Sequence, residues 1–226
     1  MQESFFIKLQ LLPLFQGVSH DELMHMVERV KFSFVSAEEG EIVVESGTSA
    51  NKLLYALSGT LTSKRVVEQG MIVEEYLEAP FLFHPECMFG RNPCWKYTLK
   101  AQTDASLLSI SKHDVLIHLL DFLTFRLSLL NYLSSISEEI KYQNAKLQRQ
   151  SNEYLLINYL LRNVSMPYGT KSFKIGMVDL SQTLGISRLA LSKCLNNFSQ
   201  QGYITLKRGG FVVKDFALLL QYLKGG

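Results

Sequence analysis

Cysteines and paired histidines are scarce in this sequence. Three of its 226 residues are cysteine, Cys87, Cys94 and Cys194, and they form no CxxC motif. Three thiols cannot build an even disulfide framework, and they fall short of the four that hold an iron–sulfur cluster. The five histidines include no H-x-H pair. We therefore expect a protein of the reducing cytoplasm, without a metal site.

A long uninterrupted apolar run is also missing. The nearest approach, residues 115–133, is interrupted by charged side chains such as Asp121 and Arg126, which are costly in lipid. The first five residues contain neither a basic segment nor a small-residue cleavage site. We therefore expect no membrane span and no secretory signal.

Acidic residues are scarce in the C-terminal part of the chain. Residues 141–226 contain three Asp and Glu against 12 Lys and Arg, whereas residues 1–140 contain 18 against 11. The small net charge of +2 hides this asymmetry. An acidic module followed by a basic one is typical of a chain whose far end binds a polyanion.

The most informative stretch reads as two short helices joined by a tight turn. Val178, Leu180 and Leu184 supply an apolar side to the first helix, and Gly185 ends it with a left-handed residue. Ser187 is placed to cap the second helix. This pattern predicts a helix–turn–helix, and the alternative is a helical hairpin that merely packs.

The second of these helices has one buried and one polar, basic face. The predicted buried positions, Leu191, Cys194 or Leu195, and Phe198, recur every three to four residues. The opposite face then carries hydrogen-bond donors and no acidic residue, as a helix in the DNA major groove requires. Its residues are Arg188, Leu189, Ser192, Lys193 and Asn196.

A hairpin with a basic tip follows the helix pair. Residues 203–206 and 211–213 are rich in β-branched and aromatic side chains, and residues 207–210 form a turn between them. Lys207 and Arg208 place two cations at this turn, where a phosphate backbone would pass. The C-terminal part therefore predicts a winged helix–turn–helix.

Residues 30–110 alternate short apolar segments with turn residues. Segments spaced by roughly ten residues predict a sandwich or barrel and not a parallel sheet. The predicted strands are 32–35, 41–45, 53–57, 60–67, 71–77, 97–101 and 107–110. Capping boxes at 19–22 and 111–114 predict a helix on either side of them.

A long helix is predicted from about Asp121. Its apolar residues step by alternating fours and threes, which keeps one seam in register as in a two-chain coiled coil. The alternative is a core helix beneath the strands. The predicted seam consists of Phe122, Leu129, Leu133, Ile136, Ile140 and Leu147.

This order of parts resembles the Crp/Fnr superfamily of bacterial transcription regulators. Residues 12–23 are similar to the opening helix of that family, residues 53–60 to its LYxLSG strand and turn, and residues 175–213 to its winged helix–turn–helix. The resemblance implies an α+β fold in three parts. These are a double-stranded, jelly-roll β-roll of cyclic-nucleotide-binding type at 1–120, a dimerisation helix at 121–149 and the DNA-binding domain at 150–226.

The resemblance also implies partners and DNA contacts. We expect a homodimer on palindromic double-stranded DNA, with RNA polymerase as a further partner. The base-reading positions of the family correspond to Arg188, Leu189 and Lys193. Phosphate contacts are assigned to Ser187, Lys207 and Arg208, with Ser192 on the same face.

The family's effector site departs from the cyclic-AMP pattern. Counting back from residues 101–104, the Gly-Glu pair that holds the ribose corresponds to His84-Pro85, and the Arg-Ser pair that holds the phosphate corresponds to Trp95-Lys96. We therefore expect an effector other than cyclic AMP, and the sequence identifies neither it nor a cofactor. The candidate pocket residues are Phe83, His84, Pro85, Trp95, Lys96 and Tyr97.

Several alternatives stay open. The chain could respond to a cyclic nucleotide after all, or bind haem through His84, or switch by oxidation of Cys87 and Cys94. A different class would be a cupin-like enzyme, or a sensor domain with a basic tail. The cupin reading lacks the H-x-H pair that its metal needs.

Overall fold

The computed structural model describes the backbone of residues 6–7, 9–145 and 151–222, and the side chains of these residues except those of 68 and 137–145. The chain divides into two compact units. Unit 1 comprises residues up to 61 and residues 77–138, and unit 2 comprises residues 62–76 together with those from 139 onward. The domain boundaries 1–120, 121–149 and 150–226 stay a prediction. The structure adds that residues 62–76 group with the C-terminal part.

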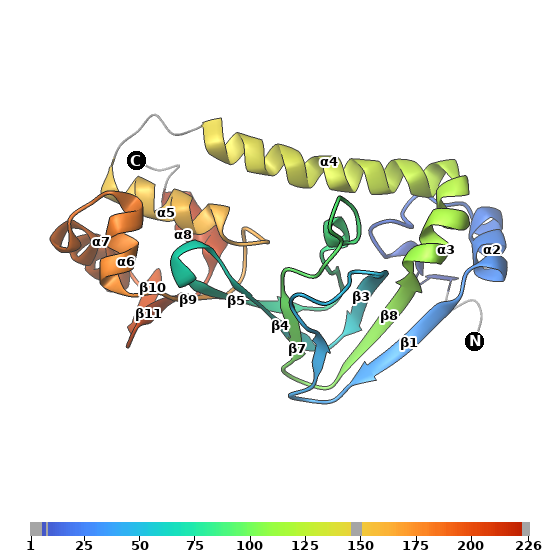
Figure 1. The fold of residues 1–226 in the computed structure, drawn as a ribbon, viewed down its shortest axis with the longest axis horizontal. Coiled ribbons are helices and arrows are strands. Elements are labelled where there is room, and N and C mark those ends of the chain that lie inside the picture. Colours follow the sequence, from blue (N-terminus) through green and yellow to red (C-terminus); the bar gives the residue numbers. More distant parts are fainter. Residues whose placement is uncertain (1–5, 8, 146–150, 223–226) are drawn as a thin grey trace. The chain divides into compact units, whose positions relative to one another are not determined.

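Unit 1 contains a roll of antiparallel strands (Figure 1). One sheet has the order β1 (Phe32–Ala37), β8 (Ala105–Ser111), β3 (Lys52–Ser58) and β6 (Phe81–Leu82), and β2 (Ile42–Val44) pairs with β7 (Thr98–Ala101). A hairpin of β4 (Thr60–Val66) and β5 (Ile72–Glu78) connects β3 to β6 along the chain. Every strand predicted from the sequence is therefore present, and β6 is an additional short one.

Local capping explains where the helices of unit 1 begin. Helix α2 (His20–Arg29) starts at a capping box in which the Ser19 hydroxyl accepts from the Glu22 N–H and the Glu22 carboxylate accepts from the Ser19 N–H. Helix α3 (Lys112–Ile117) starts where the Ser111 hydroxyl accepts from the Asp114 N–H. The first capping box is as predicted. At the second, the predicted serine cap is present, and the Asp114 carboxylate accepts from the Ser111 hydroxyl, 2.8 Å away. The long helix α4 spans Leu123–Ala145.

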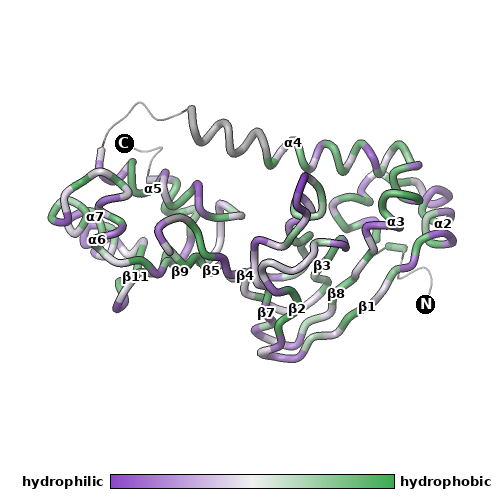
Figure 2. The backbone as a smooth tube through the Cα atoms, viewed as in Figure 1, coloured by the Kyte–Doolittle hydropathy of each residue, from purple (hydrophilic) through white to green (hydrophobic). Residues whose placement is uncertain are grey.

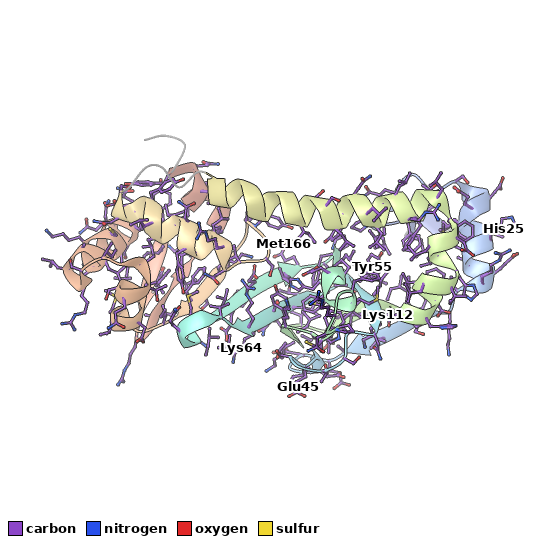
Figure 3. The ribbon with its side chains drawn as sticks, turned by 45° about the horizontal axis from the view of Figure 1, so that its top comes forward. His25, Glu45, Tyr55, Lys64, Lys112 and Met166 are labelled. Carbon is purple, nitrogen blue, oxygen red and sulfur yellow. The ribbon has the colours of Figure 1, made fainter. Side chains whose placement is uncertain are left out.

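Unit 1 has two apolar cores. One packs Leu23 and Met26 of α2 and Phe125 of α4 against strand residues such as Tyr55, which is fully buried (Figure 3). The other fills the interior of the roll and includes Phe83, Trp95 and Tyr97 among its members. The second core is the one that occupies the predicted effector site.

The described residues of unit 2 from 151 onward combine the helices α5 to α8 with an antiparallel sheet. Helix α5 (Asn152–Arg162) is capped by Ser151, whose hydroxyl accepts from the Tyr154 N–H. The sheet has the order β10 (Ile204–Lys207), β11 (Gly210–Val213), β9 (Lys171–Lys174) and β5, and the remaining helices are α6 (Met177–Leu184), α7 (Arg188–Gln200) and α8 (Phe216–Tyr222). One core of residues from all these elements joins the sheet to the helices.

Candidate functional site

Helices α6 and α7 form the predicted helix–turn–helix. Helix α6 ends at Gly185, which adopts a left-handed conformation with φ of 66° and donates its N–H to Gln182 and Ser181 carbonyls. Helix α7 begins after Ser187, whose hydroxyl accepts from the Ala190 N–H at 3.1 Å. A side chain at position 185 would be strained in this conformation, so the tight turn between the helices depends on glycine.

The apolar side of α6 differs from the prediction at one residue. Leu180 is buried and Leu184 packs against the core, but Val178 is 45% exposed. Val178 lies in the first turn of a short helix whose buried side is completed by Ser181, which is 4% exposed. The prediction that Val178 belongs to the buried side was therefore wrong.

The outer face of α7 carries the predicted polar and basic residues. Leu191, Cys194, Leu195 and Phe198 are buried in the core of unit 2. The opposite side is open to solvent except at Ser192, which is half-buried. Its exposed residues are Arg188, Leu189, Lys193 and Asn196. In the described part of α7 these donors have no acidic neighbour on the helix.

Strands β10 and β11 form the predicted wing. They are joined by a two-residue turn, Arg208-Gly209, and Lys207 pairs with Gly210 across it. A Cβ atom at Gly210 would collide with the Phe173 carbonyl oxygen of β9, so the wing packs closely on its neighbouring strand because this residue has no side chain. Lys207 and Arg208 are both exposed at the tip.

A crevice lies between α7 and the wing. It has a volume of about 260 Å³ and is bordered by polar groups of Ser192, Asn196 and Lys207 and by apolar residues of both elements. In protein–DNA complexes such side-chain donors contact either base edges or phosphate oxygens. The arrangement can therefore contact base edges through α7 and phosphates through the wing.

The structure brings the predicted effector residues together as a filled aromatic cluster. Phe83, Trp95 and Tyr97 are 1%, 2% and 8% exposed. The Phe83 ring centroid lies 5.5 Å from that of Trp95, and the His84 ring stacks on Tyr97 at 3.6 Å. Each ring therefore occupies space that a ligand would need. Pro85 begins a short 3-10 helix, Pro85–Met88, and Lys96 is exposed.

Glu86 also belongs to this cluster, and the sequence analysis missed it. Its carboxylate Oε1 atom lies 2.7 Å from His84 Nδ1. Burial raises the pKa of the Glu86 carboxyl, but the hydrogen bond to His84 and the nearby charges of His84 and Lys96 outweigh it and lower the pKa below its ordinary value. A carboxylate therefore stands beside the predicted site. Counting along the sequence placed the family's acidic position one residue earlier, on Pro85.

The cysteines are poorly placed for a redox switch. Cys87, Cys94 and Cys194 are free thiols, and Cys87 and Cys194 are buried. Burial raises the pKa of Cys87 and raises that of Cys194 to about 11, so these two thiols stay protonated at neutral pH. Among the described residues no three His, Cys, Asp or Glu side chains are grouped so that they could hold a metal ion.

Helix α4 has two apolar faces, and unit 1 covers one of them. Phe125 and Leu129 are 0% and 4% exposed in its core, and Phe122, Leu133 and Ile136 are half-buried. Leu129 is therefore covered by its own chain and has no surface left for the predicted dimer seam. Ile140 and Leu147 lie outside the described side chains.

The second apolar face of α4 is exposed. Leu123, Leu127 and Leu130 are 57%, 48% and 55% exposed, and they step by four and three residues along the helix. Figure 2 shows hydrophobic residues recurring along its described part.

No single described helix is long and apolar enough to span a membrane. The helix pair 112–121 and 123–136 together has the required length and composition, but the two helices bend by 119°.

The comparisons with known proteins concern both the C-terminal part and the whole fold. The family model of the Crp-like helix-turn-helix domain matches residues 156–222. The catabolite activator protein of Thermus thermophilus is similar over 94% of this chain and 99% of its own, with 22% identity and a TM-score of 0.52. No curated protein matches the chain in sequence.

Two further solved structures are similar. A protein from Eubacterium rectale described as a transcriptional regulator of the Crp/Fnr family covers 95% of this chain and 99% of its own, with 16% identity and a TM-score of 0.53. The sensor domain of the transcriptional regulator DNR from Pseudomonas aeruginosa covers 66% and 97%, with 23% identity and a TM-score of 0.53. These likenesses show the fold, and the domain match shows that the basic C-terminal part is a folded helix–turn–helix domain and not a tail. Residues 156–222 therefore form a Crp-like helix–turn–helix domain, and the chain as a whole has a fold similar to that of these regulators.

Proposed function

We propose that this protein is a DNA-binding transcription regulator that acts in the cytoplasm as a homodimer, and that its β-roll senses an effector other than cyclic AMP. The observation that carries the DNA-binding mode is the exposed basic edge of unit 2, formed by Arg188 and Lys193 of α7 and by Lys207 and Arg208 of the wing. We assign RNA polymerase as a further partner. Electrophoretic mobility shift with genomic fragments tests the proposal, and absence of any retarded fragment contradicts it.

Within this interface, Arg188 reads bases and the wing binds phosphates. A guanidinium can donate to guanine O6 and N7 together, whereas Leu189, which is 68% exposed, offers apolar contact such as that to a thymine methyl. Ser187 caps α7 with its oxygen, and its hydroxyl proton stays available for a phosphate. Ser192 and Lys193 complete the contacts of α7, and Lys207 and Arg208 bind the backbone.

We expect Arg188→Ala to relax sequence preference at a cost of about 1–3 kcal/mol at one base position, because a bidentate base contact is lost. The matched control, Lys207→Ala, should weaken binding to all sequences alike and reduce its salt dependence. Selection from randomised duplexes measures both variants. An unchanged site profile for Arg188→Ala would show that another residue reads that base.

The dimer is proposed to form through the exposed face of α4. Leu123, Leu127 and Leu130 present an apolar stripe with the 3–4 spacing of a two-helix seam. Two copies related by a two-fold axis would place two α7 helices on a near-palindrome with half-sites about 34–36 Å apart. This stripe replaces the seam that the sequence predicted through Leu129.

Cyclic AMP is proposed not to be the effector, because the predicted pocket residues include no arginine for its phosphate, and their lysine, Lys96, is exposed. Trp95 occupies the position that the family resemblance assigns to arginine, and it offers one indole N–H and no charge. The Glu86 carboxylate adds a negative charge beside the site. Losing a charge-assisted pair costs about 2–5 kcal/mol, which turns a micromolar site into one of roughly millimolar affinity.

Isothermal calorimetry with cyclic AMP should therefore show no binding at micromolar concentrations. One observation favours the opposite reading. Glu86 Oε2 is buried and has no hydrogen-bond partner among the described residues, so it could accept from a ribose hydroxyl. Low-micromolar binding of cyclic AMP that also tightens DNA binding would establish a cyclic-nucleotide-responsive regulator and contradict our proposal.

A further inference from the structure

The hairpin of β4 and β5 is divided between the two units. Residues 61 and 77 belong to unit 1, and the intervening residues 62–76 belong to unit 2. Figure 3 shows Lys64 on this hairpin, and the Val67 N–H donates to the Met71 carbonyl at its tip, 2.8 Å apart. A segment that is an excursion from the β-roll in sequence is thus a structural part of the DNA-binding unit.

Strand β5 extends the wing sheet by a fourth strand. It pairs antiparallel with β9, and the pairs run from Ile72 with Lys174 to Glu75 with Lys171. Val73 and Met71 are 1% and 0% exposed in the core of unit 2. The hairpin therefore covers an edge of the wing sheet. It also contributes side chains to the core of unit 2.

A buried ion pair lies on the core side of this strand pairing. Lys171 Nζ is 2.9 Å from Glu75 Oε2, and the two side chains are 0% and 2% exposed. The same carboxylate accepts from the N–H groups of Ser165 and Met166, at 2.8 and 3.2 Å. Burial raises the pKa of Glu75, but Lys171 and these donors outweigh it and lower the pKa, so the carboxylate is charged.

The physical cost of this pair suggests its role. Apolar side chains of similar size would usually stabilise such a position as well or better, whereas loss of one partner leaves a buried charge uncompensated. The pair therefore makes docking of the hairpin conditional on one register, since a shift of one residue would turn Glu75 away from Lys171.

The register also connects the hairpin to the wing tip. Val73 pairs with Phe173 and Phe173 with Phe211, so three strands are aligned in one row. At the end of the sheet Lys174 pairs with Gly210, which in turn pairs with Lys207. A displacement of β5 is thus transmitted through β9 to the basic turn.

We propose that the hairpin of residues 62–76 docks on β9 through its strand β5 and is held in register by the Glu75–Lys171 pair. Through this docked hairpin the β-roll controls the wing. This inference rests on the proposed function, because its outcome is DNA binding. The docked hairpin orders the wing sheet, and release of the hairpin loosens it. No ligand needs to be known for the test.

Glu75→Gln in the full chain removes the charge that Lys171 requires. Hydrogen exchange of the amides of residues 171–174 and 204–213 should accelerate by at least about tenfold, and affinity for DNA should fall by about tenfold. The matched control is Glu74→Gln on the opposite face of β5. The Glu74 side chain is 18% exposed, and its partner Lys174, 3.2 Å away, is 55% exposed, so this variant should change both readouts less than about twofold. Equal exchange in the two variants overturns the proposal.

A cross-link separates coupling from simple destabilisation. Glu74 and Ser172 are directly paired on the outer face of β5 and β9, so Glu74→Cys with Ser172→Cys places two thiols within reach of a disulfide. Added to Glu75→Gln, the oxidised bond should restore slow exchange and DNA affinity, and reduction should remove both. If the oxidised protein exchanges slowly but binds DNA no better, docking does not control the wing. If the wild type binds no DNA, the proposed function fails, while the exchange data still decide whether the strand docks.

Discussion

Leu127→Asp should convert the protein to a monomer and lower its affinity for a palindromic operator by at least about a hundredfold. Leu127 lies between Leu123 and Leu130 on the exposed face of α4, so a two-fold seam would bring two carboxylates together in an apolar contact. A monomer loses the second half-site, and linked binding of two sites contributes about 10²–10⁴ in affinity. Sedimentation and mobility shift measure the two effects.

Two further substitutions on α4 make this result specific. Ser135→Asp adds the same charge at an exposed position about 80° around the helix from Leu127, and it should leave a dimer. Ile136 lies about three turns from Phe125 on the half-buried face, so Ile136→Asp should lower the stability of unit 1 and leave association less affected. Monomers from Ile136→Asp and dimers from Leu127→Asp would restore the seam that the sequence predicted.

Trp95→Ala should destabilise unit 1 by about 3–5 kcal/mol. The side chain is 2% exposed and contacts Phe83 inside the roll, and truncating a buried tryptophan removes its burial and leaves a cavity. Trp95→Phe should cost less because it keeps a ring in place. Since Trp95 is the only tryptophan of the chain, denaturation is best followed by circular dichroism.

The same variant tests whether the effector site is filled. An apolar cavity of this kind stays dry and binds small aromatic molecules, so indole should raise the midpoint of Trp95→Ala and leave that of the wild type unchanged. A loss of stability below about 1 kcal/mol, or stabilisation of the wild type by indole, would mean that Trp95 swings out in solution and that the site is open to a flat ligand.

The sequence alone determined the elements whose signals are local. Ser19, Ser111 and Ser187 cap helices as predicted because a hydroxyl and the N–H groups three residues later suffice to form the cap. Gly185 marks the turn between α6 and α7 through its own backbone conformation. The winged helix–turn–helix and the strands of the β-roll follow from such short-range patterns.

Only the tertiary structure decided what covers each face. Periodicity placed Leu129 in the predicted seam and did not indicate that unit 1 buries this residue and leaves Leu127 exposed. Proximity of Glu86 to His84 depended on a left-handed residue at His84, with φ of 37°, which no count along the chain reveals.

The Glu75–Lys171 pair is the clearest case of tertiary control. Neither residue stands out in the sequence, which predicts no strand at Lys171, and both side chains are almost fully buried in the structure. The free energy of a buried charge depends on its partner. Here the pairing of two strands that are distant in the sequence brings the two charges together. Local chemistry therefore defined the parts of this protein, and long-range packing defined which of their surfaces are left exposed.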